Sequence, residues 1–162
     1  MKEQLKQALK NAELHLADNK ALIKKLKKQN KNELDKVFHL CNDEVFNEIN
    51  CLDCANCCKT TGPRIINADI GRMSKALKIK PSDFVEKFLR TDEDGDYVFK
   101  TMPCPFLEKD NYCSIYENRP VACREYPHTD RKRMYQILDL TLTNSLICPA
   151  VATIFEKIKY TR

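Results

Sequence analysis

Glycine is scarce in this chain. Only three glycines occur in 162 residues, at Gly62, Gly71 and Gly95, and no two of them lie within eight residues of each other. Glycine-rich phosphate loops and the dinucleotide-binding fingerprint both need clustered glycines. The sequence therefore excludes the classes of nucleotide-binding protein that depend on such loops.

Long apolar stretches are missing as well. No run approaches the roughly eighteen consecutive apolar residues that a membrane-spanning helix needs. The chain begins with a charged stretch and lacks the short apolar segment that is typical of a secretory signal peptide. We therefore expect a cytoplasmic protein without a membrane segment.

Cysteine, in contrast, is abundant. The chain has nine cysteines, and four of them lie within residues 51–58. Because the cytosol keeps thiols reduced, a dense set of this kind indicates metal binding or redox chemistry. Cys41 stands apart from the others on the apolar stripe of a predicted helix, and we expect it to pack in the core as a small apolar side chain.

The net charge of +5 belongs to the N-terminal segment. Residues 1–31 contain nine lysines and three acidic residues, whereas the rest of the chain is close to neutral. A basic arm of this kind suggests an alternative function, as an adaptor that binds nucleic acid or an acidic protein. Nucleic acid is the less favoured partner, because no arginine or aromatic residue is interleaved with these lysines to read bases.

The periodicity of apolar residues predicts a mainly helical α+β fold. Residues 1–50 are expected to form a basic helical hairpin, broken at the polar residues 29–32, with Asn32 as the N-cap of the second helix. Residues 51–162 are expected to form a metal-organised, cysteine-cluster domain of short helices with a β-hairpin.

Within that second domain the local signals are clear at several points. Residues 51–62 have no period and predict a loop. Asn67 is expected to cap a short helix, and another is expected to start at Pro81. Residues 97–99 predict a strand, and residues 104–107 and 112–115 predict a hairpin. Residues 129–147 fit a strand or a helix, and Pro149 is expected to open a closing helix.

The cysteine spacing carries the chemistry. In Cys51-x-x-Cys54-x-x-Cys57-Cys58, two intervening residues let a tight turn aim two sulfurs at one ion, as in zinc and iron–sulfur sites. A bacterial ferredoxin run would place its next cysteine three residues further on, so the pattern departs from that motif. Adjacent residues point in different directions, and we expect Cys57 and Cys58 to serve different metals or different edges of one cluster.

Four later cysteines bring the candidate ligands to eight, which is enough for two four-sulfur sites. Such sites carry negative charge, for which Arg119, Arg124 and the helix start after Cys148 provide compensation. His128 lies near Cys123 and is a further candidate ligand, whereas His15 and His39 are expected to face water. The predicted ligands are Cys51, Cys54, Cys57, Cys58, Cys104, Cys113, Cys123 and Cys148.

These motifs resemble a known family. Residues 51–58, the helix start at Asp69, residues 104–107 and the dense stretch of residues 113–127 are similar to the CxxCxxCC-type, zinc- or iron-chelating domain of YkgJ-like cysteine-cluster proteins. The resemblance covers about residues 51–148 and implies metal chelation by the eight cysteines. The same domain type occurs in flagellin lysine N-methylase, but this chain lacks the glycine-rich loop that many methyltransferases use, so that activity is not transferred.

Three functions remain open from the sequence. The first is a protein with thiolate-ligated zinc, iron or an iron–sulfur cluster, since the spacing does not separate these metals. The second is the basic adaptor with structural zinc, and the third is a thiol redox sensor. A nucleophilic cysteine enzyme is weaker, because no cysteine has a histidine and a carboxylate or amide partner close in the sequence.

Overall fold

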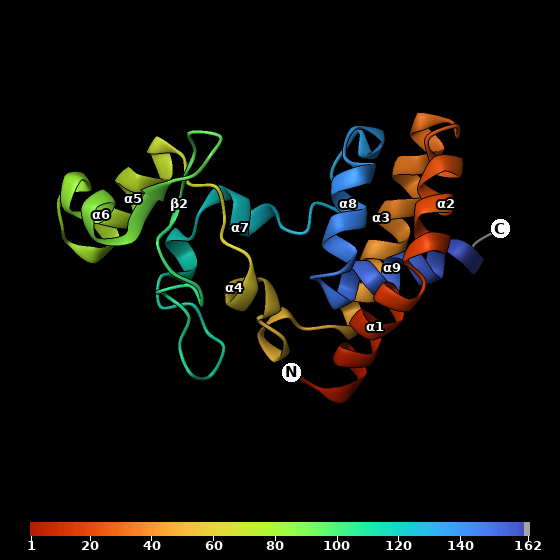
Figure 1. Cartoon of the computed structure of the whole chain (residues 1–162), viewed down its shortest axis with the longest axis horizontal. Helices are drawn as coiled ribbons and strands as arrows, with labels where there is room; N and C mark the ends of the chain where they lie inside the picture. Colours follow the sequence, from red (N-terminus) through yellow and green to blue (C-terminus); the bar gives the residue numbers. More distant parts are fainter. Residues whose placement is uncertain (161–162) are drawn as a thin grey trace. The chain divides into compact units, whose positions relative to one another are not determined.

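The computed structural model describes residues 1–160, which divide into two compact units (Figure 1). The helical unit comprises residues 1–54 and 127–160, and the loop unit comprises residues 55–126. These bounds follow packing, because the closing helix shares a core with the N-terminal helices. The predicted segments, residues 1–50 and 51–162, follow the cysteine pattern instead, and that division stays a prediction.

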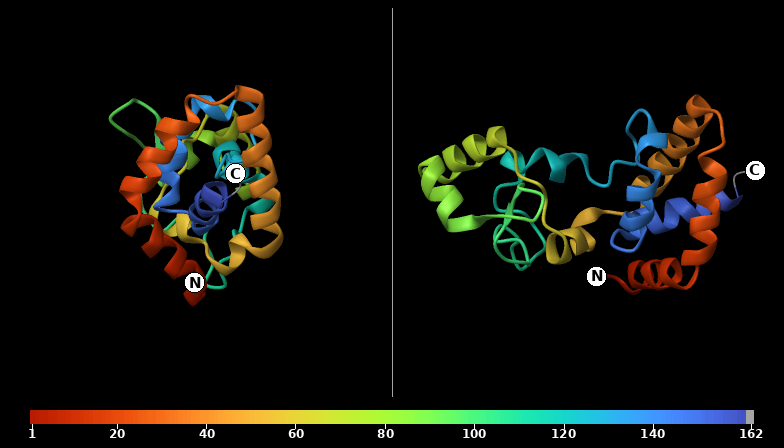
Figure 2. Two further views of the ribbon diagram at one scale, coloured as in Figure 1. Left: turned by 90° about the vertical axis from the view of Figure 1, so that its right-hand side faces the viewer. Right: turned by 45° about the horizontal axis from the view of Figure 1, so that its top comes forward.

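The helical unit is built around its last helix. That helix packs against α1, α3 and α8, and α2 packs against α8. The left view of Figure 2 looks along this last helix, with the N-terminal helices around it. Its core includes Leu34, Phe38, Leu138 and Phe155, all almost fully buried. The main elements are α1 (Glu3–Leu14), α2 (Leu16–Leu26), α3 (Lys31–Glu48), α8 (Leu138–Ser145) and α9 (Pro149–Tyr160), with short 3-10 helices η1 (Cys51–Asp53) and η3 (Met134–Gln136).

The predicted N-terminal hairpin is wrong in one respect, because its first helix is two helices. The chain bends at His15, between α1 and α2. The apolar residues of α1 pack toward α9, whereas those of α2 pack toward α8. The bend therefore lets the apolar residues of α1 and those of α2 pack against different helices. The expected break at residues 29–32 is confirmed.

The N-cap of α3 also differs from the prediction. Asn30, rather than Asn32, caps the helix, since its side-chain oxygen accepts from the backbone N–H of Asn32 at 2.9 Å and of Glu33 at 3.3 Å. An N-cap side chain satisfies N–H groups two and three residues further on. Asn30 has those N–H groups inside the first turn of α3, and this decides the cap.

The loop unit has its own core, in which four phenylalanines meet. The ring centroids of Phe88 and Phe106 are 5.0 Å apart, and those of Phe99 and Phe106 are 5.6 Å apart. Phe84 completes the group and is fully buried. The elements are α4 (Asn56–Thr60), α5 (Asn67–Leu77), α6 (Pro81–Phe88), β1 (Leu89–Thr91), β2 (Tyr97–Phe99), the 3-10 helix η2 (Tyr116–Asn118) and α7 (Val121–Glu125).

The β-hairpin lies earlier in the chain than predicted. β1 and β2 pair antiparallel with Leu89 opposite Phe99, around a turn in which Gly95 adopts a φ of 83°. The strand at residues 97–99 is confirmed, but its partner was expected to be helical. Residues 104–115 form only one β-bridge, between Leu107 and Cys113, rather than two strands. Pairing with β2 therefore outweighs the helical pattern at Leu89.

Other local predictions are confirmed. Pro81 and Pro149 are the first residues of α6 and α9, where a fixed φ and a missing N–H suit the helix start. Residues 138–145 of the ambiguous stretch are helical. Two predictions are wrong in detail: the cap of α5 is Ile66, one residue before Asn67, and residues 56–60 of the expected loop form α4. Within residues 1–160, no single helix has the length and apolar composition to span a membrane. In this part of the chain, only α8 and α9 taken together have that length and apolar composition, and they are bent by 115° at their junction.

Candidate metal centre

The loop unit gathers four cysteines from four segments. They lie on α4, in the loop after β2, in the turn before η2 and on α7: Cys58, Cys104, Cys113 and Cys123. The backbone N–H of Cys104 donates to the carbonyl oxygen of Cys58 at 2.8 Å and joins the first two segments. All four thiols interact electrostatically, because the charge of one raises the pKa of the next. The fold therefore brings four sulfur donors into one environment.

Burial dominates the acidity of three of these thiols. It raises the pKa of Cys123 to about 12 and that of Cys104 to about 11, and it raises the pKa of Cys113 in the same direction. Neighbouring thiols add to the rise. Backbone N–H groups of Phe106 and Ile115 oppose it at Cys104 and Cys113. An ionised set of four thiolates therefore needs positive charge close by.

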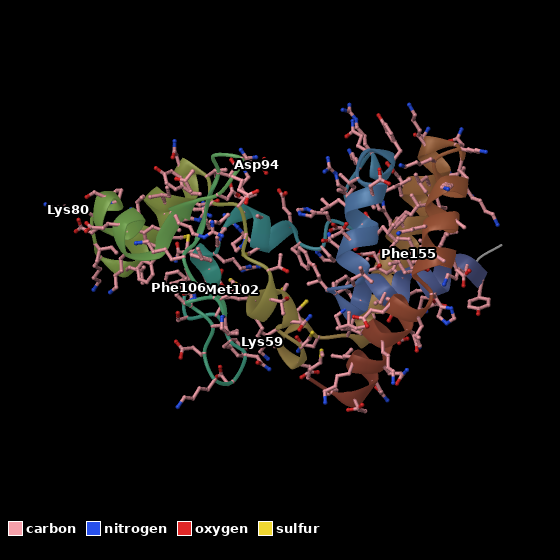
Figure 3. The ribbon with its side chains drawn as sticks, viewed as in Figure 1. Lys59, Lys80, Asp94, Met102, Phe106 and Phe155 are labelled. Carbon is pink, nitrogen blue, oxygen red and sulfur yellow. The ribbon has the colours of Figure 1, made fainter. Side chains whose placement is uncertain are left out.

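Cys58 is the exception. Its pKa is lowered to about 7, mainly by a hydrogen bond with the Cys57 thiol, whose Sγ lies 3.9 Å away. Burial opposes this shift, and the Lys59 ammonium adds to it. Lys59 also donates to the Asn111 side-chain oxygen at 2.8 Å, which ties α4 to the turn before Cys113; Figure 3 labels Lys59. Cys58 is thus the thiol of the four that ionises most readily.

Arg119 supplies positive charge to this group. Its guanidinium lies 3.8 Å from the centre of the Tyr116 ring and donates to the Tyr116 carbonyl oxygen at 2.7 Å. From this position it opposes, with its charge, the burial that raises the pKa of Cys113 and Cys123. The compensation expected from Arg119 is therefore present. Arg124 is exposed on α7, and a role for it stays a prediction.

A buried carboxylate positions the segment that carries Cys123, and sequence reasoning missed this role. Asp69, only 1% exposed, accepts from the backbone N–H of Val121 at 3.1 Å and from Arg72 Nη2 at 2.5 Å. The same Arg72 nitrogen donates to the carbonyl oxygen of Arg119 at 2.9 Å. α5 therefore holds both Arg119 and Val121, the first and last residues of the short link that leads into α7. The available signal was an aspartate and an arginine three residues apart at a helix start.

The helical unit holds a second group of thiols, those of Cys51, Cys54 and Cys148. Burial raises the pKa of Cys148 to about 11, and the thiols of Cys51 and Cys54 add to the rise. The N–H groups of Val151 and Ala150, in the first turn of α9, oppose it, as the predicted helix start requires.

A short turn holds the first two of these thiols. The N–H of Cys54 donates to the carbonyl oxygen of Cys51 at 3.0 Å, and the Cys54 thiol contacts Met1 Sδ at 3.5 Å. The helical unit therefore contributes three sulfur donors to this second group.

Two cysteines have other surroundings. Cys57 lies on α4 with its sulfur toward that of Cys58. Cys41 is 2% exposed and belongs to the core of the helical unit, so the expectation of core packing is confirmed. Within residues 1–160, no three thiol, imidazole or carboxylate groups already stand in the arrangement of a closed metal site. The donors are gathered and chemically suited to a soft metal, and their roles as ligands stay a prediction.

The histidines differ in their partners. His15 is exposed and lies 3.3 Å from Asp18, as expected for a solvated side chain. His39 donates from Nε2 to the carbonyl oxygen of Arg131 at 2.9 Å and so serves the fold of the helical unit. His128 adopts a positive φ of 68°, and its role as a ligand stays a prediction.

Comparison with known proteins yields one finding. A family model, CxxCxxCC, described as a proposed zinc- or iron-chelating domain, matches residues 50–145. A search of curated proteins gives no match to the chain, and neither does a search of solved structures. The matched stretch spans more than half of the chain and includes seven of the eight predicted ligands, all but Cys148. The chain therefore belongs to the CxxCxxCC family of zinc- or iron-chelating domains.

Proposed function

We propose that this protein binds zinc or iron through its cysteine thiolates, and that the loop unit provides one complete four-sulfur site. The observation that carries the proposal is the shared environment of Cys58, Cys104, Cys113 and Cys123, which four separate segments bring together. Four thiolates match the ligand set of structural zinc and of iron–sulfur centres. In a loop unit with few long elements, a bound metal would crosslink these segments and contribute folding free energy.

The helical unit supplies further donors in this proposal. Cys51, Cys54 and Cys148 form a second thiol group, and Cys57 is the remaining member of the eight-cysteine ligand set. Backbone N–H groups favour the thiolate form in both groups, and in the loop unit the charges of Arg119 and Lys59 add to this effect. Metal binding releases protons from the buried thiols, so affinity falls as the pH falls.

The redox-sensor alternative has less support. A sensor cysteine needs a low pKa and access to solvent, whereas burial raises the pKa of Cys104, Cys123 and Cys148. The pKa of the Cys58 thiol shifts in the opposite direction. The cytoplasm remains the location that we propose, because a reducing compartment keeps the thiols available for metal.

The test is metal analysis of the full chain purified without air. Zinc, iron and acid-labile sulfide are measured together with the visible spectrum, for the wild type and for Cys123→Ser and Cys41→Ala. We expect bound metal in the wild type, a clear loss in Cys123→Ser, and unchanged content in Cys41→Ala, because Cys41 is a core residue. Zinc in a colourless protein would indicate a structural site, and iron with sulfide would indicate a cluster.

Two results would contradict the proposal. One is a wild type that holds no metal even when purified without air. The other is a Cys123→Ser variant that keeps its full metal content and affinity.

A further inference from the structure

Two basic stretches that are about a hundred residues apart in the sequence meet on the helical unit. One is the end of α2 and the turn that follows it, and the other is the segment that leads into η3. Lys27 Nζ lies 2.8 Å from the Asp139 carboxylate, and Lys31 Nζ lies 4.4 Å from the centre of the Tyr135 ring. These contacts place the lysine-rich turn beside residues 135–139.

Hydrogen bonds to α3 fix the second stretch. The Asp35 carboxylate accepts from the backbone N–H of Arg133 and of Met134, both at 2.8 Å. His39 donates to the carbonyl oxygen of Arg131 at 2.9 Å. The side chains of Arg131, Lys132 and Arg133 are exposed, and the Arg131 guanidinium donates to the carbonyl oxygen of Lys132 at 3.2 Å.

The surface formed in this way has an excess of positive charge. We call it the basic face and define it by Lys24, Lys25, Lys28, Arg131, Lys132 and Arg133. Two carboxylates of this region have other partners, since Asp139 pairs with Lys27 and Asp35 accepts backbone N–H groups, whereas the exposed Asp130 directly precedes Arg131 and offsets one positive charge. No ion pair found in residues 1–160 neutralises any member of the basic face.

The fold removes the main objection to a nucleic-acid partner. Along the sequence the lysines lack arginines, but the hydrogen bonds to α3 hold the backbone of Arg133 one helical turn from Lys31 and that of Arg131 two turns from it. An arginine guanidinium binds phosphate through two parallel hydrogen bonds, whereas lysine adds point charge. Tyr135 is half-buried beneath Lys31, so it is no platform for stacking an unpaired base. These features suit the phosphates of a duplex rather than a single strand.

We propose that the basic face binds the phosphate backbone of double-stranded nucleic acid without reading its sequence. Lysines and arginines that replace condensed counterions give an affinity that falls steeply as salt rises. The proposal concerns a surface that contains none of the predicted metal ligands, and it is independent of the metal site.

The test compares matched charge changes in the metal-loaded full chain. Lys28→Gln/Arg131→Gln/Lys132→Gln removes three charges from the basic face. Lys75→Gln/Lys80→Gln/Arg90→Gln removes three exposed charges from the loop unit and serves as the control. Binding to a labelled DNA duplex of mixed sequence is followed by fluorescence anisotropy over a range of salt concentrations, and circular dichroism confirms that both variants stay folded.

We expect the basic-face variant to lose about tenfold or more in affinity and its salt dependence to become shallower by up to about three in slope. The control should keep the affinity and the slope of the wild type. An equal loss in both variants would overturn the proposal, because it would mean that only net charge matters. It would also be overturned if the wild type bound polyglutamate or anionic lipid vesicles but not the duplex.

Discussion

Asp69 shows how a single buried carboxylate organises a candidate metal site from a distance. It touches none of the thiols, yet it accepts the N–H of Val121, and its partner Arg72 holds the carbonyl oxygen of Arg119. Arg119 in turn places its charge near Cys113 and Cys123. At the scale of residues, the thiols depend on this support as much as on their spacing.

Replacing Asp69 with asparagine tests this support. Asp69→Asn keeps the shape of the side chain but removes the charge that pairs with the part-buried Arg72, so we expect a loss of about 2–4 kcal/mol in the stability of the loop unit. The measurement is urea unfolding followed by circular dichroism. Asp83→Asn is the control, because Asp83 is exposed and its side chain accepts from Ser82. Equal stability of the two variants would show that the network has no such role.

At the scale of elements, helix ends and bends are set by different forces. The starts of α6 and α9 at Pro81 and Pro149 follow from proline geometry alone. The bend at His15 does not, because the apolar period of residues 1–26 continues through it. It exists because α1 and α2 pack on different helices.

The cap of α3 provides a prediction at this scale. Asn30→Ala removes two hydrogen bonds to backbone N–H groups, and we expect it to lower the free energy of unfolding by about 1 kcal/mol. Asn32→Ala changes the same residue type two positions later, inside the helix, and should have little effect or a slight stabilising one. Thermal and urea unfolding of both variants decide between them. A larger loss of stability in Asn32→Ala than in Asn30→Ala would show that Asn32 is the N-cap, as the sequence predicts.

At the scale of the whole molecule, each unit has its own apolar core. The helical unit packs long helices around α9, whereas the loop unit depends on a cluster of four phenylalanines and on short elements. Residues 104–123, which carry three of the gathered thiols, contain one β-bridge, η2 and part of α7. The regular elements of this stretch are therefore short, and Phe106 and Ile115 anchor it to the core.

Removal of the metal should therefore act unevenly. We expect a chelator to speed amide hydrogen exchange in residues 104–123 while α3 and α9 keep their protection, because a large apolar core packs these two helices against each other. Exchange followed by mass spectrometry, with and without chelator, measures the difference segment by segment. Uniform loss of protection across both units would contradict independent cores, and no change anywhere would argue against a structural metal.

The sequence by itself determined the thiol chemistry and the residues at which several helices begin. The cysteine spacing indicated a zinc- or iron-chelating domain and its family, and Cys41 was recognisable as a core residue from its place on an apolar stripe. Proline starts and the polar break before α3 were also predictable. All of these signals act over a few residues, through dihedral preference, hydrogen bonding within a turn and helical period.

Only the tertiary structure decided which distant residues meet. It gathered Cys58, Cys104, Cys113 and Cys123, placed Asp69 under the link into α7, and held the segment of Arg131 and Arg133 against α3. It also moved the β-hairpin to residues 89–99, because pairing with β2 stabilises residues that alone would continue a helix. Such contacts depend on which faces are buried together, and no local pattern in the chain specifies that choice.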